Sequence, residues 1–178
     1  MKVKLLISTV VAVFLAAGAT TAQAHSSLST LPKQIKVYRA EVNHMRTVMG
    51  VPAMQYAMGA AFQGWVLVSP RDVLVHELVA WKRTTKIVRW MYGQVPNKNA
   101  WLCIHRGEGA WNDPNSPFWG GLQMDMSFQR AYGSYLLRKK GTADNWTPLE
   151  QMWTAEKARR SGRGFYPWPN TARNCGLI

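Results

Sequence analysis

One glutamate in this sequence stands in a setting that suits acid–base chemistry. Glu108 comes at the end of a plausible helix that starts at Ala100, and it is followed by Gly109, Ala110 and Trp111. Apolar surroundings disfavour the charged form of a carboxyl group, and glycosidic cleavage needs a carboxyl group that still carries its proton when it meets the leaving oxygen. Glu108 is therefore a candidate general acid, although a glutamate near a tryptophan is by itself typical of surface and capping positions.

The residues that follow Glu108 could hold a carbohydrate. Gln123 ends the run Phe118-Trp119-Gly120-Gly121-Leu122-Gln123, whose glycines allow close approach of the backbone and whose amide can hydrogen-bond an acetamido group. Four aromatic rings could stack on sugars, although we expect two of them in the core: Trp111, Trp119, Tyr132 and Phe165. His105 could tune Glu108, but a packed, hydrogen-bonded histidine is the commoner case.

Two aspartates are candidates for the second carboxylate that hydrolytic glycosidases use. Asp113 lies in the turn Asn112-Asp113-Pro114-Asn115, where an aspartate normally accepts backbone hydrogen bonds. Asp125 follows the Gly-Gly-Leu-Gln run, where it either contacts a substrate or caps a helix. Both alternatives stay open at this level.

A series of motifs runs in order from Cys103 to Cys175. After a cysteine come E-x-x-W at Glu108 to Trp111, aromatic-G-G-L-Q, Glu150-Gln151, Ala155-Glu156, Gly164, Trp168-Pro169 and Cys175-Gly176. This segment resembles the resuscitation-promoting-factor-like, lysozyme-fold transglycosylases. It is also similar to the wider lytic transglycosylases, in which E-S-x-aromatic precedes G-L-M-Q. The ordered set is more specific than any one motif, and nothing before Asn97 takes part in it.

The resemblance implies a lysozyme-like fold whose cleft binds alternating N-acetylglucosamine and N-acetylmuramic acid. Glu108 would protonate the bridging oxygen and then act as a base. The substrate-binding residues that it implies are Gln123, Trp111, Trp119, Asp125 and Tyr132. If neither aspartate serves as a second carboxylate, a one-acid mechanism is favoured, in which the substrate's own hydroxyl attacks as in lytic transglycosylases.

The sequence departs from this family between the cysteine and the acid. The family usually joins its cysteine directly to the catalytic glutamate, whereas residues 104–107 intervene here. Alignment on Trp111 from the cysteine–glutamate version puts Arg106 at the catalytic position, and alignment on the E-x-x-W spacing puts Glu108 there. Only the second alignment supplies an acid, so Glu108 is the expected catalytic residue.

The first 24 residues predict export. Lys2 and Lys4 precede an apolar run from Leu5 to Ala17, and small residues lead to Ala24, after which we expect cleavage. The run is shorter than the roughly 20 residues that a membrane-spanning helix needs. A signal peptide is therefore favoured over an uncleaved anchor, and we expect a secreted or cell-wall-associated protein without a stable membrane span.

The charge of the chain favours anionic partners. Its net charge is +13, and without Lys2 and Lys4 the 22 basic residues fall to 20 against 9 acidic ones, which leaves +11. The basic residues are spread over both halves of the chain rather than gathered as in a groove that reads phosphates. We expect peptidoglycan glycan strands and anionic wall polymers as partners, no nucleic acid, and a monomer.

Cys103 and Cys175 are the only cysteines. An even count in an oxidising compartment predicts one disulfide, which the loop-entropy model values at about 4 kcal/mol for a ring of this size. No metal or cofactor is expected, because the thiols lie far apart and the histidines lack ligand spacing. Ala80 stands where a zinc-protease helix beginning at His76-Glu77 needs its second histidine.

The elements that position these residues are predicted to be mainly α-helical, in an α+β lysozyme-like arrangement. We interpret residues 25–68 as a linker passing into one or two uncertain helices, residues 69–96 as a helical extension and residues 97–178 as the compact catalytic domain. Within that domain, helices are expected over residues 100–106, from Gly120-Gly121 through Tyr132, and from Thr147 to about Ser161.

The firmest predicted helix lies in the extension. Ser69 can cap it, Pro70 fits its first position, Asp72 lies in its first turn and Gly93 follows its end. Its apolar stripe is Leu74, Leu78, Trp81, Val88 and Met91, and its basic residues are Lys82, Arg83, Lys86 and Arg89. These basic side chains could contact a wall polymer but are more simply a solvated face.

Three classes of function are consistent with these observations. The leading one is an exported peptidoglycan-cleaving enzyme, either a lytic transglycosylase or a muramidase, with a single glutamate as general acid and base. The alternative is a non-catalytic cationic wall-binding or signalling module. A membrane-disrupting protein fits less well, because the basic residues of helix 70–92 lie mostly in its second half.

Overall fold

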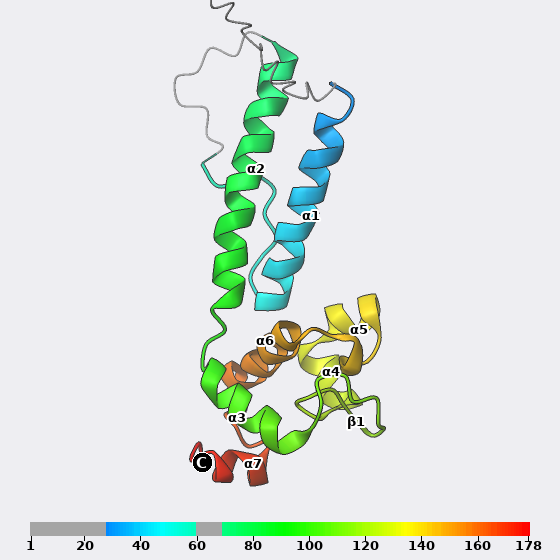
Figure 1. The fold of residues 1–178 in the computed structure, drawn as a ribbon, viewed down its shortest axis with the longest axis vertical. Helices are drawn as coiled ribbons and strands as arrows, with labels where there is room; N and C mark the ends of the chain where they lie inside the picture. Colours follow the sequence, from blue (N-terminus) through cyan, green and yellow to red (C-terminus); the bar gives the residue numbers. More distant parts are fainter. Residues whose placement is uncertain (1–27, 60–68) are drawn as a thin grey trace, which may run out of the picture.

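The computed structural model describes residues 28–59 and 69–178, so the predicted signal peptide, residues 1–24, lies outside it. The described chain is mainly helical, with seven α-helices and one two-stranded sheet (Figure 1), which confirms the predicted helical class. In chain order its elements are α1 (Leu31–Met49), α2 (Pro70–Gly93), α3 (Lys98–Glu108), β1 (Phe118–Trp119), β2 (Met124–Asp125), α4 (Met126–Tyr132), α5 (Ser134–Lys140), a 3-10 turn (Ala143–Asn145), α6 (Pro148–Ala158), a π-helical turn (Arg159–Arg163) and α7 (Pro169–Asn174).

Two long helices, α1 and α2, lie side by side, run in the same direction and extend away from the smaller helices (Figure 1). Residues 50–59 return along them. Asn43 holds this return segment through two hydrogen bonds with the backbone of Met54, and Met58 N donates to Thr84 Oγ1. The pairing buries apolar side chains that neither helix could bury alone.

Helix α1 is the one helix in the described part of residues 25–68. Its buried side chains recur every three or four residues: Leu31, Ile35, Val42, Met45, Val48 and Met49. It ends at Gly50, whose φ of 77° is left-handed and suits a glycine. The segment interpreted as a linker with uncertain helices therefore carries a regular amphipathic pattern over 19 residues.

The start of α2 is as predicted. Ser69 accepts a hydrogen bond from the backbone of Asp72, and Pro70 lies in the first turn. Gly93 is the last helical residue rather than the first one beyond the end, and Met91 of the predicted stripe is exposed. The four basic residues Lys82, Arg83, Lys86 and Arg89 are exposed, and Arg89 pairs with Glu41 of α1 at 2.6 Å.

Helix α6 forms the centre of the C-terminal part, since almost all of its residues are buried. It begins with a capping box, in which Thr147 accepts from Glu150 N and Glu150 accepts from Thr147 N. The helix ends at Ala158 and continues as the π-helical turn, in which Gly162 has a φ of 98°. The predicted helix from Thr147 thus exists, but its regular part is shorter than expected.

The expected helix from Gly120-Gly121 is wrong in its first half. Gly120 and Gly121 lie in the turn between β1 and β2, which pair Phe118 with Asp125 and Trp119 with Met124. Gly120 has a φ of 73°, and a Cβ atom there would lie 2.6 Å from Gln151 Oε1 of α6. The glycines therefore serve a tight turn pressed against the central helix, and α4 begins only at Met126.

The predicted disulfide is confirmed: Cys103 of α3 is joined to Cys175 at the end of α7, with an S–S distance of 2.01 Å. It links the first and the last helix of the C-terminal part. None of the helices in residues 28–59 and 69–178 has the length and apolar character needed to cross a membrane.

Candidate active site

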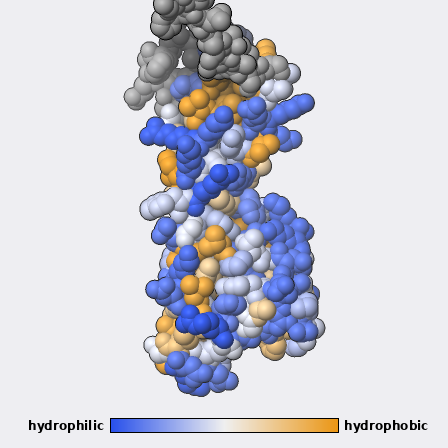
Figure 2. Space-filling view, viewed as in Figure 1, coloured by the Kyte–Doolittle hydropathy of each residue, from blue (hydrophilic) through white to orange (hydrophobic). Residues whose placement is uncertain are grey.

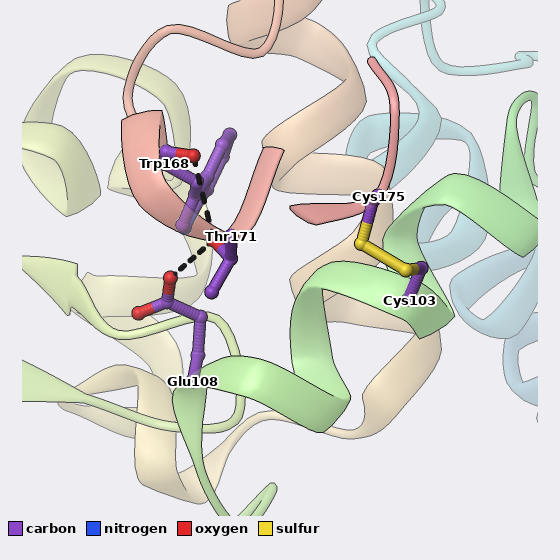
Figure 3. The surroundings of a disulfide bond; sticks show 5 residues. All are labelled: Cys103, Glu108, Trp168, Thr171 and Cys175. Atoms are coloured by element: carbon purple, nitrogen blue, oxygen red, sulfur yellow. Dashed lines mark hydrogen bonds between the residues drawn. A yellow bond between two sulfur atoms is a disulfide. The ribbon is translucent and has the colours of Figure 1, made fainter. Parts of the chain in front are cut away.

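Glu108 is the last residue of α3, and its side chain is half-buried. Its Oε1 accepts a hydrogen bond of 2.6 Å from Thr171 Oγ1 on α7 (Figure 3). Arg106, two residues earlier, is exposed and lines neither of the cavities described below. Of the two residues that the alternative alignments put at the catalytic position, Glu108 lines a cavity and Arg106 does not.

Two adjoining cavities lie beside Glu108, and together we call them the groove. The cavity at Glu108 has a volume of about 230 Å³. The second has a volume of about 120 Å³ and contains Asp125. The two cavities share four lining residues: Phe118, Gln123, Pro167 and Trp168. Because these residues border both cavities, the two cavities adjoin along them.

Gln123 lines both cavities, and its side-chain amide is fixed in orientation. Its Nε2 donates to Asp113 Oδ2 at 3.0 Å and to the carbonyl of Gly120 at 2.9 Å. Both partners are acceptors, so the nitrogen must face them, and within the described chain no hydrogen bond reaches Oε1. The backbone of Gln123 has a φ of 45°, a left-handed conformation that non-glycine residues rarely adopt. The amide oxygen of this lining residue is therefore available to accept a hydrogen bond.

Asp113 has the structural role expected of a turn aspartate. Its Oδ1 accepts from the backbone and side-chain nitrogens of Asn115, and its Oδ2 accepts from Gln123. It lines neither cavity of the groove. Asp113 therefore orients Gln123 rather than facing a substrate.

Asp125 is the N-cap of α4. Its Oδ1 accepts from Phe128 N and from Ser127 Oγ, each at 2.7 Å. The hydrogen bond from Phe128 N, followed by that from Ser127, lowers the pKa of Asp125 below its ordinary value, so this carboxyl group remains ionised. Asp125 lines the smaller cavity but not the cavity of Glu108.

The aromatic residues predicted to stack on sugars do not line the groove. All four are partly buried and packed against the core: Trp111, Trp119, Tyr132 and Phe165. Phe118 and Trp168 line it instead. Adjacent residues of a strand point to opposite faces, so Phe118 faces the groove and is 46% exposed whereas Trp119 turns away. Trp168 is buried and donates from Nε1 to the carbonyl of Leu122 at 2.6 Å.

His105 is a packed, hydrogen-bonded histidine. Its ring stacks on Trp111 at a centroid distance of 3.8 Å, and its Nδ1 lies 3.1 Å from the carbonyl of Gly121. A Cβ atom on Gly121 would lie 2.6 Å from this ring. His105 thus supports the turn that carries Gln123 rather than contacting Glu108.

Several residues of the site were not predicted from the sequence. Thr171 contacts Glu108, Asn170 lines the same cavity, and Arg163 lines the smaller one. Thr171 and Asn170 follow the Trp168-Pro169 motif, which was the available signal, but only the packing of α7 against α3 brings them to Glu108. In the described ranges, no group of three or more His, Cys, Asp or Glu side chains is arranged to hold a metal ion.

In comparisons with known proteins, the chain matches no family model, no curated protein and no solved structure.

Proposed function

We propose that this protein cleaves the glycan strands of peptidoglycan with Glu108 as its single general acid and base, in a domain of the lysozyme-like type. The observation that carries the proposal is the groove, in which the carboxyl group of Glu108 and the amide of Gln123 line one continuous open space. The ordered motifs from Cys103 to Cys175 support the same activity through their resemblance to transglycosylases.

The arrangement of carboxyl groups favours a lytic transglycosylase over a muramidase. Asp113 binds Gln123, Asp125 caps α4, and no second carboxylate of the described chain lines the cavity of Glu108. Hydrolysing enzymes with two carboxylates need the second one close enough to attack the sugar or to activate water. A single acid is sufficient when the attacking hydroxyl belongs to the substrate.

In the proposed reaction Glu108 first gives its proton to the glycosidic oxygen, and the bond between that oxygen and the anomeric carbon of N-acetylmuramic acid breaks. The substrate's own 6-hydroxyl oxygen then bonds to the anomeric carbon, and its proton passes to the Glu108 carboxylate. The products are a shortened strand and a 1,6-anhydro-muramic end. No water is consumed, and the glutamate regains its starting protonation state.

The remaining residues of the groove would bind the strand. The free Oε1 of Gln123 can accept the N–H of an acetamido group, and Phe118 offers an exposed ring for a sugar face. Arg163, whose guanidinium lies 5.9 Å from the Phe128 ring, lines the far cavity and suits a carboxylate of a stem peptide. The proposed substrate is therefore an acetylated, acidic polymer.

A second candidate function is a non-catalytic wall-binding module. Its support is the exposed face of α2, where Lys82, Arg83 and Lys86 accompany Trp90, which is 67% exposed. Figure 2 shows one face of the molecule as mostly hydrophilic, with apolar residues in separate patches. Export by the signal peptide and a net charge of +11 after its removal would bring either kind of protein, as a monomer, to anionic wall polymers.

Digestion of purified sacculi tests the proposal. We expect soluble muropeptides with anhydro-muramic ends, whereas a muramidase would produce reducing ends. Glu108→Gln should abolish release, and Glu41→Gln, a matched change at the exposed pair with Arg89, should leave it intact. Salt-sensitive sedimentation with sacculi and no released muropeptides would instead identify the binding module. Equal activity of Glu108→Gln and the parent protein would show that the acid is another residue.

A further inference from the structure

We infer that Thr171 is a positioning residue for Glu108, which holds one carboxyl oxygen so that the other meets the substrate. The inference rests on the proposed function, because it assigns Thr171 a part in the same acid–base step. Its direct basis is the hydrogen bond of 2.6 Å from Thr171 Oγ1 to Glu108 Oε1, between helices α7 and α3 (Figure 3).

This hydrogen bond makes the two carboxyl oxygens of Glu108 chemically different. The threonine hydroxyl has a single proton, and its other acceptor within reach, the carbonyl of Trp168, lies at 3.4 Å. The shorter bond therefore directs the proton to Glu108 Oε1. An oxygen that already accepts a hydrogen bond is the less suitable of the two to carry the acid proton. Oε2 is thus left to give its proton to the glycosidic oxygen and to take one back.

Gly107 provides the space for this contact. A Cβ atom at residue 107 would lie 2.6 Å from Thr171 Cγ2, closer than side chains pack. Gly107 is the second-last residue of α3, and the C-cap of the helix is Gly109. The close approach of Thr171 therefore accounts for the absence of a side chain at residue 107.

The disulfide sets the register of the same helix contact. Cys103 lies four residues before Gly107 and Cys175 four residues after Thr171. Residues four apart share one face of a helix, so the Cys103–Cys175 bond and the contact between Gly107 and Thr171 are successive contacts between α3 and α7. Figure 3 shows the disulfide and Thr171 on this side of α3. Helix α7 has only six residues, and the covalent tether holds it where its threonine reaches Glu108.

The test compares variants of Thr171 by initial rates on soluble, uncrosslinked glycan strands. Thr171→Val keeps the shape but removes the hydroxyl, and it should lower kcat by roughly ten- to a hundredfold, the effect of losing a hydrogen bond to a charged group. KM should stay the same, because the strand still fills the groove. Thr171→Ser keeps the hydroxyl and should restore most of kcat.

One further variant separates positioning from a structural role. Gly107→Ala keeps the hydroxyl but pushes Thr171 away, so it should lower kcat in the same manner even if Thr171→Val does not fold. Folding is checked by thermal unfolding of the oxidised protein.

The outcomes distinguish the inference from the proposed function. An active parent with an inactive Glu108→Gln, a slow Thr171→Val and a restored Thr171→Ser supports both. If folded Thr171→Val keeps the kcat of an active parent, Thr171 has no positioning role and the proposed function stands. A parent protein that releases no product from glycan strands overturns the function and, with it, the inference.

Discussion

His44 of α1 lies 3.0 Å from the buried carboxylate of Glu150 on α6, and this pair joins the N-terminal helices to the part of the protein that carries the groove. Lys140 of α5 approaches the same carboxylate at 2.7 Å, and Tyr135 Oη lies 3.0 Å from the other ring nitrogen of His44. Three helices thus meet at one carboxyl group. Removal of the Glu150 carboxylate should therefore weaken the attachment of α1 to α6.

The first prediction concerns the pH dependence of stability. Burial alone would raise the pKa of Glu150, but hydrogen bonds from His44, Lys140 and Thr147 N outweigh it and lower the pKa from 4.5 to about 2. A carboxyl group whose pKa is lowered by folding stabilises the folded protein at pH values above its unfolded-state pKa. This contribution is lost as the pH falls towards the folded-state pKa. The free energy of unfolding should therefore decrease between pH 4.5 and 2.

Glu150→Gln tests this dependence by urea unfolding at several pH values. The variant leaves His44 and Lys140 without a carboxylate, so it should lose about 3–5 kcal/mol at neutral pH and show a flatter acid limb. Glu41→Gln removes an exposed pair and should cost less than about 1 kcal/mol. An acid limb as steep in Glu150→Gln as in the parent would contradict the prediction.

The second prediction concerns the disulfide. Cys103→Ser with Cys175→Ser should lower the free energy of unfolding by about 4 kcal/mol, because the ring no longer restricts the unfolded chain. If the protein is active, kcat should also fall in this variant, since α7 is no longer tethered beside Glu108. Urea unfolding of the oxidised parent, the reduced parent and the variant provides the measurement. Unfolding midpoints that agree among all three would rule out a stabilising role.

The third prediction concerns recognition by Gln123. Gln123→Ala should raise KM on acetylated glycan strands and have little effect on de-N-acetylated strands, because its amide oxygen is proposed to accept the acetamido N–H. The expected loss is about tenfold in kcat/KM, as for one hydrogen bond in a binding site. Gln94→Ala, at the exposed end of α2, is the control. An equal loss on both kinds of strand would indicate a structural role for Gln123.

The fourth prediction concerns the glycine turn. Gly120→Ala should destabilise the protein by about 2–3 kcal/mol, through its positive φ and through the contact of the new Cβ with Gln151. Gly162→Ala is the matched control, because Gly162 also has a positive φ but no atom lies within 4 Å of its Cβ position. The difference between their thermal unfolding midpoints isolates the contact with Gln151. Equal midpoints would show that backbone strain alone is responsible.

Several elements could be predicted because the residues that determine them lie within four positions of one another in the sequence. Ser69 with Asp72 and Thr147 with Glu150 form caps that are local in sequence and in space. The disulfide could be predicted from two cysteines in a chain with a predicted export signal. The apolar pattern of α1 is equally local, but α1 has no side-chain cap and no acidic residue in its first turn, so the sequence carries fewer signals for it.

The sequence by itself determined the helical class, the caps, the disulfide and Glu108 as the candidate acid, because these depend on residue type and short spacing. Only the tertiary structure decided which side chains face the acid. Thr171 is 63 residues from Glu108 along the chain, and Gln151 presses on a turn that begins 31 residues earlier, at Gly120. Phe118 rather than Trp119 lines the groove because successive side chains of a strand point to opposite faces. A strand of two residues is too short for this alternation to be recognised in the sequence.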